Sequence, residues 1–132
     1  MKDILKNLFK RELEKVPDSV RFTFSQSFPE AINEDWSIEG KYWEVVFYHN
    51  QKEKIAKFSK DGQLEELRTN VALSELPEAV NVTLSTRGEI MNAIKTQKNK
   101  TTTWEIIYRN DKLIRCLCNL DENGQEMSNR QL

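Results

Sequence analysis

The phrase "IAKFSKDGQLEE" at residues 55–66 returns in altered form as "LCNLDENGQEMS" at residues 117–128. Each copy runs from an apolar stretch through an acidic or amide corner to Gly-Gln. Asp-Gly and Asn-Gly are typical of tight β-hairpins because these residues tolerate a positive φ. The two copies therefore predict two related antiparallel hairpins in one chain.

Two further pairs of segments indicate a duplication. "VPDSVRFTF" at 16–24 aligns with "LPEAVNVTL" at 76–84, and "WEVVFYHN" at 43–50 aligns with "WEIIYRND" at 104–111. All three pairs occur in the same order, which is the signature of a repeated unit of about 60 residues.

The 132 residues fit one domain, 1–132, by length. We divide it into a leading segment at 1–15, repeat 1 at 16–75 and repeat 2 at 76–132. Apolar residues in the leading segment recur at helical spacing, namely Ile4, Leu5, Leu8, Phe9 and Leu13. This pattern predicts an extra amphipathic helix that packs on the domain or docks a partner.

Each repeat is expected to contain one helix followed by antiparallel strands. Pro17 and Pro77 are predicted at first helical positions, with an acidic residue after each. Runs of aromatic and β-branched residues, separated by turn signals, predict the strands. In repeat 1 they are expected at 35–38, 42–49, 53–59 and 63–69, and in repeat 2 at 94–97, 103–109, 113–120 and 125–130. The predicted class is α+β, with the repeats forming one sheet and the helices packed on one face.

Period-two alternation assigns the side chains of these strands to two faces. One face is apolar and is expected to lie under the helices; it holds Trp43, Val45, Phe47, Ala56, Phe58, Trp104, Ile106, Tyr108, Ile114, Cys116, Cys118 and Leu120. The opposite face is mixed and is expected to be open to solvent. Its members are our candidate binding residues: Tyr42, Glu44, Val46, Tyr48, Glu105, Ile107 and Arg109.

This pattern resembles PepSY-like domains of the kind with a β-lactamase-inhibitor-protein-like fold. The resemblance is carried by "VPDSVRFTFSQSFPEAINEDW" at 16–36, "YWEVVF" at 42–47, "KFSKDGQLEE" at 57–66 and "ALSELPEAV" at 72–80. Repeat 2 departs from it, since "STRGEIMNAIKTQKNKTTTW" at 85–104 lacks the aromatic-Pro end and the leading Trp. The resemblance implies a tandem helix-plus-antiparallel-sheet unit whose concave sheet can hold a partner protein. Related domains are often exported; several are thought to inhibit or chaperone peptidases, and many have no assigned function. It implies no catalytic residues.

No set of residues predicts a metal site, a cofactor or catalysis. The corner at 119–124 begins like a calcium loop, but Arg130 stands where a bidentate Glu is required. Zinc would need His49 together with Cys116 and Cys118, which we interpret as buried structural thiols without a disulfide. A Cys-His catalytic pair and a Glu44–Glu105 acid/base pair are the enzymatic alternatives, and both are weaker than solvated or structural roles.

Charge and hydropathy restrict the partners. A net charge of −1 gives no global field for nucleic acid, and the basic cluster at 95–100 is interpreted as a solvated turn. No apolar run is long enough to span a membrane.

We predict a non-enzymatic protein-binding module that uses the open face, with a small-ligand carrier as the alternative. The partner and oligomeric state are unknown. The chain as given is expected in the cytoplasm, or in the periplasm or outside the cell if a leader was removed.

Overall fold

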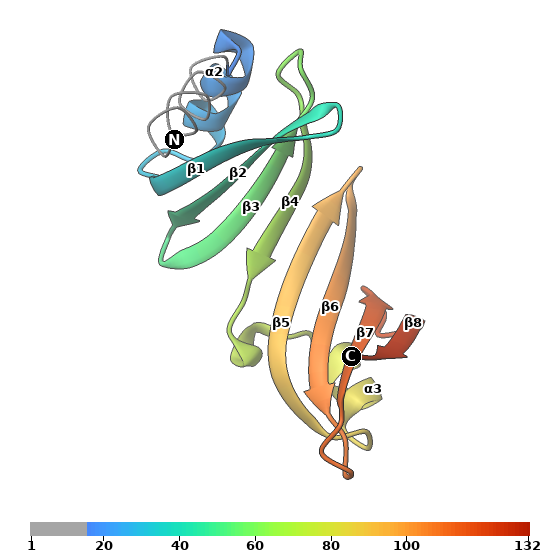
Figure 1. The fold of residues 1–132 in the computed structure, drawn as a ribbon. Coiled ribbons are helices and arrows are strands. Elements are labelled where there is room, and N and C mark those ends of the chain that lie inside the picture. The colour runs from blue at the N-terminus through green and yellow to red at the C-terminus, as the bar shows by residue number, and fades with distance from the viewer. Residues whose placement is uncertain (1–15) are drawn as a thin grey trace, which may run out of the picture. The chain divides into compact units, whose positions relative to one another are not determined.

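The computed structural model describes residues 16–132, along which an α-helix followed by four β-strands occurs twice (Figure 1). The predicted helix at 1–15 lies outside the described residues. The elements are α2 (Asp18–Ser27), β1 (Ile32–Glu39), β2 (Tyr42–His49), β3 (Lys52–Phe58), β4 (Leu64–Asn70), a 3-10 turn η1 (Leu73–Glu75), α3 (Glu78–Leu84), β5 (Glu89–Lys98), β6 (Thr101–Arg109), β7 (Arg115–Asp121) and β8 (Glu126–Gln131). Each strand is hydrogen-bonded to the next in sequence order in an eight-stranded sheet, which confirms the α+β prediction.

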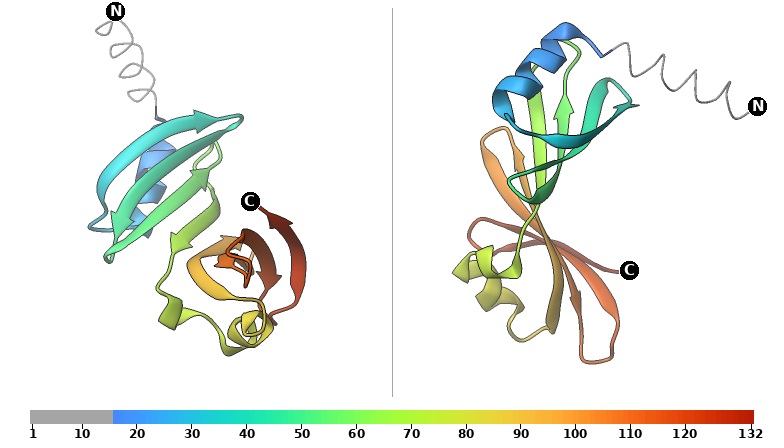
Figure 2. Two further views of the ribbon diagram at one scale, coloured as in Figure 1. Left: turned by 60° about the horizontal axis from the view of Figure 1, so that its bottom comes forward. Right: turned by 90° about the vertical axis from the view of Figure 1, so that its left-hand side faces the viewer.

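The chain divides into two compact units, with the boundary between Leu67 and Arg68 inside strand β4. Unit 1 contains α2 and β1 to β3 with the first part of β4. Unit 2 contains the end of β4, then α3 and β5 to β8. Figure 2 shows the same pairing of one helix with its own strands in each unit.

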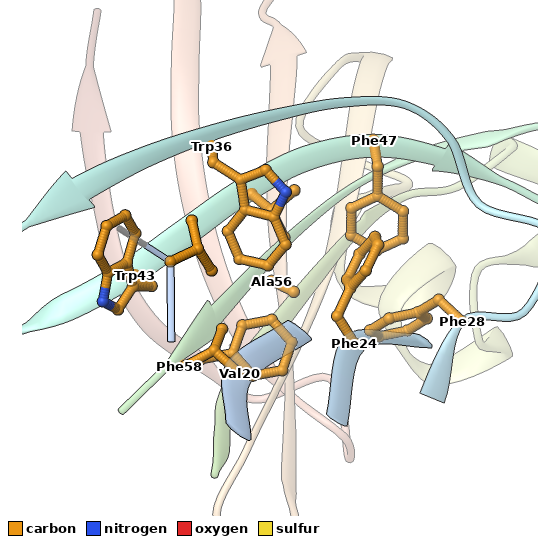
Figure 3. Close-up of a cluster of buried hydrophobic side chains, with 10 residues drawn as sticks. Val20, Phe24, Phe28, Trp36, Trp43, Phe47, Ala56 and Phe58 are labelled. Atoms are coloured by element: carbon orange, nitrogen blue, oxygen red, sulfur yellow. The ribbon is translucent and has the colours of Figure 1, made fainter. Parts of the chain in front are cut away.

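In unit 1, helix α2 covers one face of its strands. The proline prediction was one residue off, because Pro17 has an extended ψ of 147° and is the N-cap, so the helix begins at Asp18. The rings of Phe24 and Phe28 meet Phe47 with centroid distances of 5.0 and 4.8 Å (Figure 3). Trp36 lies 5.2 Å from Phe24 in an edge-on arrangement, the geometry that aromatic quadrupoles favour. The core of unit 1 is therefore an aromatic cluster.

Unit 2 repeats this plan with smaller side chains. Val80 and Leu84 of α3 are buried, as are Trp104, Ile106 and Tyr108 of β6. At the position where Trp36 faces Val45 in unit 1, Ala93 faces Ile106 in unit 2. The missing aromatic residues of repeat 2 are thus replaced by a more aliphatic core, and the leading strand still forms.

The leading strands are longer than predicted, at Ile32–Glu39 and Glu89–Lys98. Both carry a register shift near their start, between Ile32 and Asp35 and between Ile90 and Asn92. A β-bulge breaks the period-two pattern, which explains why the sequence showed only the later part of each strand. The assignment of Ile114 to a core strand was wrong, since β7 begins at Arg115 and Ile114 closes the preceding turn.

The two glycine corners form the predicted hairpins, but with only the glycine at positive φ. In the first corner, the N–H of Ser59 donates a hydrogen bond to the carbonyl oxygen of Gln63, and the N–H of Gly62 donates one to the carbonyl oxygen of Ser59. Gly62 has a φ of +91°. The second corner repeats both bonds between Asp121 and Gln125, with Gly124 at φ +77°. A Cβ on Gly62 would lie 2.8 Å from Ser19 O. The same atom on Gly124 would clash with Ala79 O. Each glycine is therefore also a point of close contact between a helix and a hairpin.

Candidate functional site

The open face of unit 1 is the side of β1 to β4 opposite the aromatic core, and we call it the acidic face. Four candidate residues lie on it in alternation along β2, namely Tyr42, Glu44, Val46 and Tyr48. The two tyrosines are exposed, whereas Glu44 and Val46 are half-buried, so Val46 is less accessible than the sequence pattern predicted. Residues directly opposite each other in an antiparallel pair share a face. The register therefore adds Ile55 beside Val46.

Charge on the acidic face is predominantly negative. Its strand residues carry five carboxylates, from Asp35, Glu39, Glu44, Glu53 and Glu66, against the ammonium of Lys57. Lys57 Nζ lies 3.9 Å from a Glu39 oxygen and 3.7 Å from a Glu66 oxygen, and 5.6 Å from the ring centre of Tyr42. Tyr48 donates a 3.3 Å hydrogen bond to Glu53. These contacts hold both tyrosine rings against charged neighbours.

The open face of unit 2 is the corresponding side of β4 to β8, and we call it the basic face. Glu105 accepts a 2.8 Å hydrogen bond from Arg68 Nη2, and Arg109 donates a 3.0 Å bond to Glu89. Ile107, also predicted for this face, is half-buried. The structure thus brings Glu105, Ile107 and Arg109 together, as the alternation of β6 required.

Several residues on the basic face were missed from the sequence. Leu117 lies opposite Ile107, and Arg130 lies opposite Leu117 in turn. Arg115 lies directly opposite Arg109. The strand register, which the sequence alone did not fix, is what brings these side chains to the face. Reading β7 in period two would have placed Arg115 and Leu117 on the side away from Cys116.

Each unit has a hollow at an equivalent place, where the end of its helix and the start of its first strand meet its second hairpin. In unit 1 it measures about 400 Å³ and is lined by residues that include Glu30, Ile32, Tyr48 and His49. In unit 2 it measures about 490 Å³ and is lined by residues that include Arg87, Glu89, Arg109 and Leu113. Both arginines are ion-paired, Arg87 with Glu126 and Arg109 with Glu89. These hollows are not the pocket between sheet and helices that the carrier alternative predicted.

The cysteine and histidine candidates belong to different units, with His49 in unit 1 and Cys116 and Cys118 in unit 2. No group of three potential ligands among His, Cys, Asp and Glu occurs within residues 16–132. Cys118 is buried, and burial, aided by its hydrogen bond to Glu126, raises the pKa of the thiol to about 11. A thiol with a raised pKa is a poor nucleophile. His49 belongs to unit 1, where its Nδ1 lies 3.0 Å from Lys54 Nζ.

The two candidate carboxylates likewise fit structural roles. Glu105 is held by Arg68, and Glu44 lies opposite Lys57 in the strand register. In the described part of the chain, no helix is both long and apolar enough to cross a membrane.

Solved structures of Bacteroides proteins share this fold. A BLIP-like protein from Bacteroides fragilis superposes with a TM-score of 0.73 at 13% identity, covering 88% of this chain and 86% of its own. A DUF2874 family protein from Bacteroides uniformis gives 0.77 at 19% identity, with coverages of 87% and 88%. A Bacteroides eggerthii protein, named provisionally as periplasmic, gives 0.79 at 20% identity and covers 88% of both chains. At these identities the similarity establishes the fold.

Comparison by sequence gives a different result from comparison by structure. No protein-family model and no curated protein matches the sequence. The β-lactamase-inhibitor-protein-like fold expected from the sequence is confirmed by the B. fragilis structure, while the relation to PepSY-like domains stays a prediction.

Proposed function

We propose that this chain is a non-enzymatic protein-binding module that uses the open faces of its sheet. The observation that carries the proposal is the pair of tyrosines on the acidic face, Tyr42 and Tyr48, which are 38% and 42% exposed. They flank the half-buried Val46 on a single strand whose other side is fixed in the core. Tyrosine is enriched at protein interfaces because it offers a large rigid surface with a polar end.

The structural neighbours support a role of this kind. The B. fragilis protein is BLIP-like, a name that refers to an inhibitor fold, and an inhibitor-like or chaperone-like module needs a partner surface and no catalytic centre. On the basic face, Arg109 provides the other residue type that is common at binding hot spots. We infer the same role for the remaining candidates, which are Glu44 and Val46 between the two tyrosines of β2, and Glu105 and Ile107 beside Arg109 on β6.

Capture of partners from a native extract tests the proposal. The double variant Tyr48→Ala/Arg109→Ala is compared with the wild-type chain as bait, with bound proteins identified by mass spectrometry. Phe22→Ala is the matched control, because Phe22 is 66% exposed on helix α2 and lies off both open faces. The proposal expects a protein that binds wild type and Phe22→Ala but is lost with the double variant. Equal capture by all three baits rules out the open faces.

The location that best fits this role is outside the cytoplasm. The B. eggerthii neighbour, provisionally named periplasmic, supports the exported alternative for this chain. Fractionation of the source cells with an antibody against the chain tests it, and recovery in the periplasmic or secreted fraction is the expected result. Recovery with cytoplasmic markers would contradict it.

The carrier alternative ranks second. The hollow of unit 2 is large enough for a small ligand, but its two guanidinium groups are already paired with carboxylates. A ligand would have to displace those pairs. Native mass spectrometry of the purified chain tests this alternative through an added mass that is lost on denaturation.

A further inference from the structure

The open faces of the two units carry opposite charge, although the whole chain is nearly neutral. On the acidic face five carboxylates stand against one ammonium group. On the basic face the cationic side chains are Arg68, Lys98, Arg109, Arg115 and Arg130. The carboxylates on that face are Glu89, Glu105 and Asp121. Ion pairs within a face leave its net sign unchanged, so one face is negative and the other positive.

On the basic face, two arginine side chains lie next to each other and repel each other in an isolated chain. Arg115 lies directly opposite Arg109 across β6 and β7, and like charges at such positions destabilise a sheet. Arg109 already has Glu89 as its partner. Within residues 16–132 neither Arg115 nor Arg130 forms an ion pair. Carboxylates from another molecule would relieve this repulsion.

The acidic face supplies such carboxylates. Asp35 and Glu53 are exposed on β1 and β3, near the exposed ring of Tyr48. A guanidinium group both pairs with carboxylates and stacks on aromatic rings. The arginines of the basic face can therefore interact with the carboxylates and the tyrosine ring of the acidic face. Apolar side chains also match, since each face has half-buried aliphatic residues between its charges, Val46 and Ile55 on one and Ile94 and Ile107 on the other.

Resting on the proposed binding role of the open faces, we propose that their occupant is a second copy of this chain, with the acidic face of one copy against the basic face of the other. Because every copy has both faces, a two-fold dimer forms the acidic–basic contact twice, and its interface as a whole is isologous. Complementary charge of this kind fixes the orientation of the copies and makes association depend on salt.

Light scattering coupled to size-exclusion chromatography measures this association. At low ionic strength the wild-type chain is expected to have an average mass of twice its 15.5 kDa. At about 1 M salt, where the Debye length is about 3 Å, the mass is expected to fall toward one chain. A single-chain mass at every concentration and at low ionic strength would overturn the proposal.

Charge reversal with mixing gives the sharpest version of the test. The first variant is Asp35→Lys/Glu53→Lys, which removes the net negative charge of the acidic face and places two ammonium groups at its exposed positions. The second is Arg115→Glu/Arg130→Glu, which makes both faces acidic. All four positions are exposed, and circular dichroism confirms that the folds are retained. Each variant alone is expected to associate at least about tenfold more weakly than wild type. An equimolar mixture is expected to recover the dimer, because the lysines at positions 35 and 53 of one variant can then pair with the glutamates at positions 115 and 130 of the other.

Control variants make the same charge changes in turns outside the faces. They are Asp111→Lys/Glu122→Lys and Lys60→Glu/Lys112→Glu, at exposed positions. The proposal expects both controls to associate like wild type. Failure of the mixture to recover association, with both variants folded, contradicts it.

Using the charge-reversed variants as baits in the native extract separates this proposal from the binding role itself. A wild-type monomer whose capture of a different protein is lost on charge reversal refutes self-association and leaves the open faces as a binding surface. A wild-type monomer whose capture is unaffected both by charge reversal and by Tyr48→Ala/Arg109→Ala refutes both.

Discussion

The hydroxyl group of Thr83 donates a 2.6 Å hydrogen bond to the carbonyl oxygen of Gly124, which ties helix α3 to the β7–β8 hairpin. Thr23 donates the same bond, at 2.7 Å, to Gly62 in unit 1. The helix of each unit is thus anchored to its glycine corner by a side chain in the same repeat position. The duplicated phrase in the sequence marks this anchor as well as a turn.

Removing the hydroxyl of Thr83 tests the anchor. Thr83→Val keeps the shape of the side chain but removes the donor, and we expect the free energy of unfolding to fall by about 1 kcal/mol. Urea denaturation measures the change. Thr101→Val, at an exposed strand end, is the control and should have little effect. A midpoint equal to that of wild type would show that the bond does not stabilise the unit.

Glycine at the corner is required for two reasons that a pair of variants separates. Gly62→Ala adds a Cβ 2.8 Å from Ser19 O, while Gly40→Ala adds one at a positive φ with no atom within 4 Å. We expect Gly40→Ala to cost about 1 kcal/mol from backbone strain and Gly62→Ala about 2 kcal/mol more, as is typical of overpacking. Chemical denaturation of both variants measures the difference. Equal destabilisation would mean that the helix moves away without cost.

Leu113 has the backbone conformation that the two corners give to glycine. Its φ is +63°, and the bonds Asn110 N–H to Ile114 O and Leu113 N–H to Asn110 O form the same type of turn. A left-handed backbone costs a residue with a side chain roughly 1–2 kcal/mol. Leu113 is 72% exposed, so its side chain gains little from packing. We therefore expect Leu113→Gly to raise the melting temperature.

The control for this variant is Lys112→Gly in the same turn. Residue 112 has no positive φ, so glycine there relieves no strain and only increases the freedom of the unfolded chain. We expect it to lower the melting temperature slightly. If both variants lower it, the conformation of Leu113 carries no strain.

The buried thiol of Cys118 makes stability depend on pH in the alkaline range. Burial raises its pKa from 9.0 to about 11, with the hydrogen bond to Glu126 adding to the effect. The unfolded chain then loses this proton at a lower pH than the folded chain. The resulting stabilisation is complete below pH 9 and is lost as the pH rises toward 11.

Denaturation of wild type and Cys118→Ala as a function of pH isolates this contribution, because other alkaline titrations are common to both. We expect the stability of wild type to fall more steeply than that of the variant between about pH 9 and 11. Parallel profiles would contradict the assignment.

The sequence predicted local structure better than it predicted the surface. Alternation along β2 and β6 placed Tyr42, Glu44 and Arg109 on the open faces, because a strand has a strict period of two. Alternation within a strand does not determine which neighbour lies opposite a residue. The Arg109–Arg115 juxtaposition and the ion pair of Arg68 with Glu105 therefore became visible only with the strand register.

Two other features had no clear signal in the sequence. The bulges at the start of β1 and β5 interrupt the alternation, so the leading strands were predicted too short. Leu113 has a left-handed conformation although leucine disfavours it, and the start of β7 was consequently misplaced. Both features follow from how the strands pair and not from local preference.

Oxidative footprinting of the open faces tests the central claim most directly. The chain is labelled in dilute buffer and in native extract, and modification of Tyr42 and Tyr48 is compared with that of Phe22, which lies on the exposed side of α2. The account predicts that labelling of both tyrosines falls in the extract while that of Phe22 does not. Unchanged labelling of the tyrosines, or a fall confined to Phe22, would contradict it.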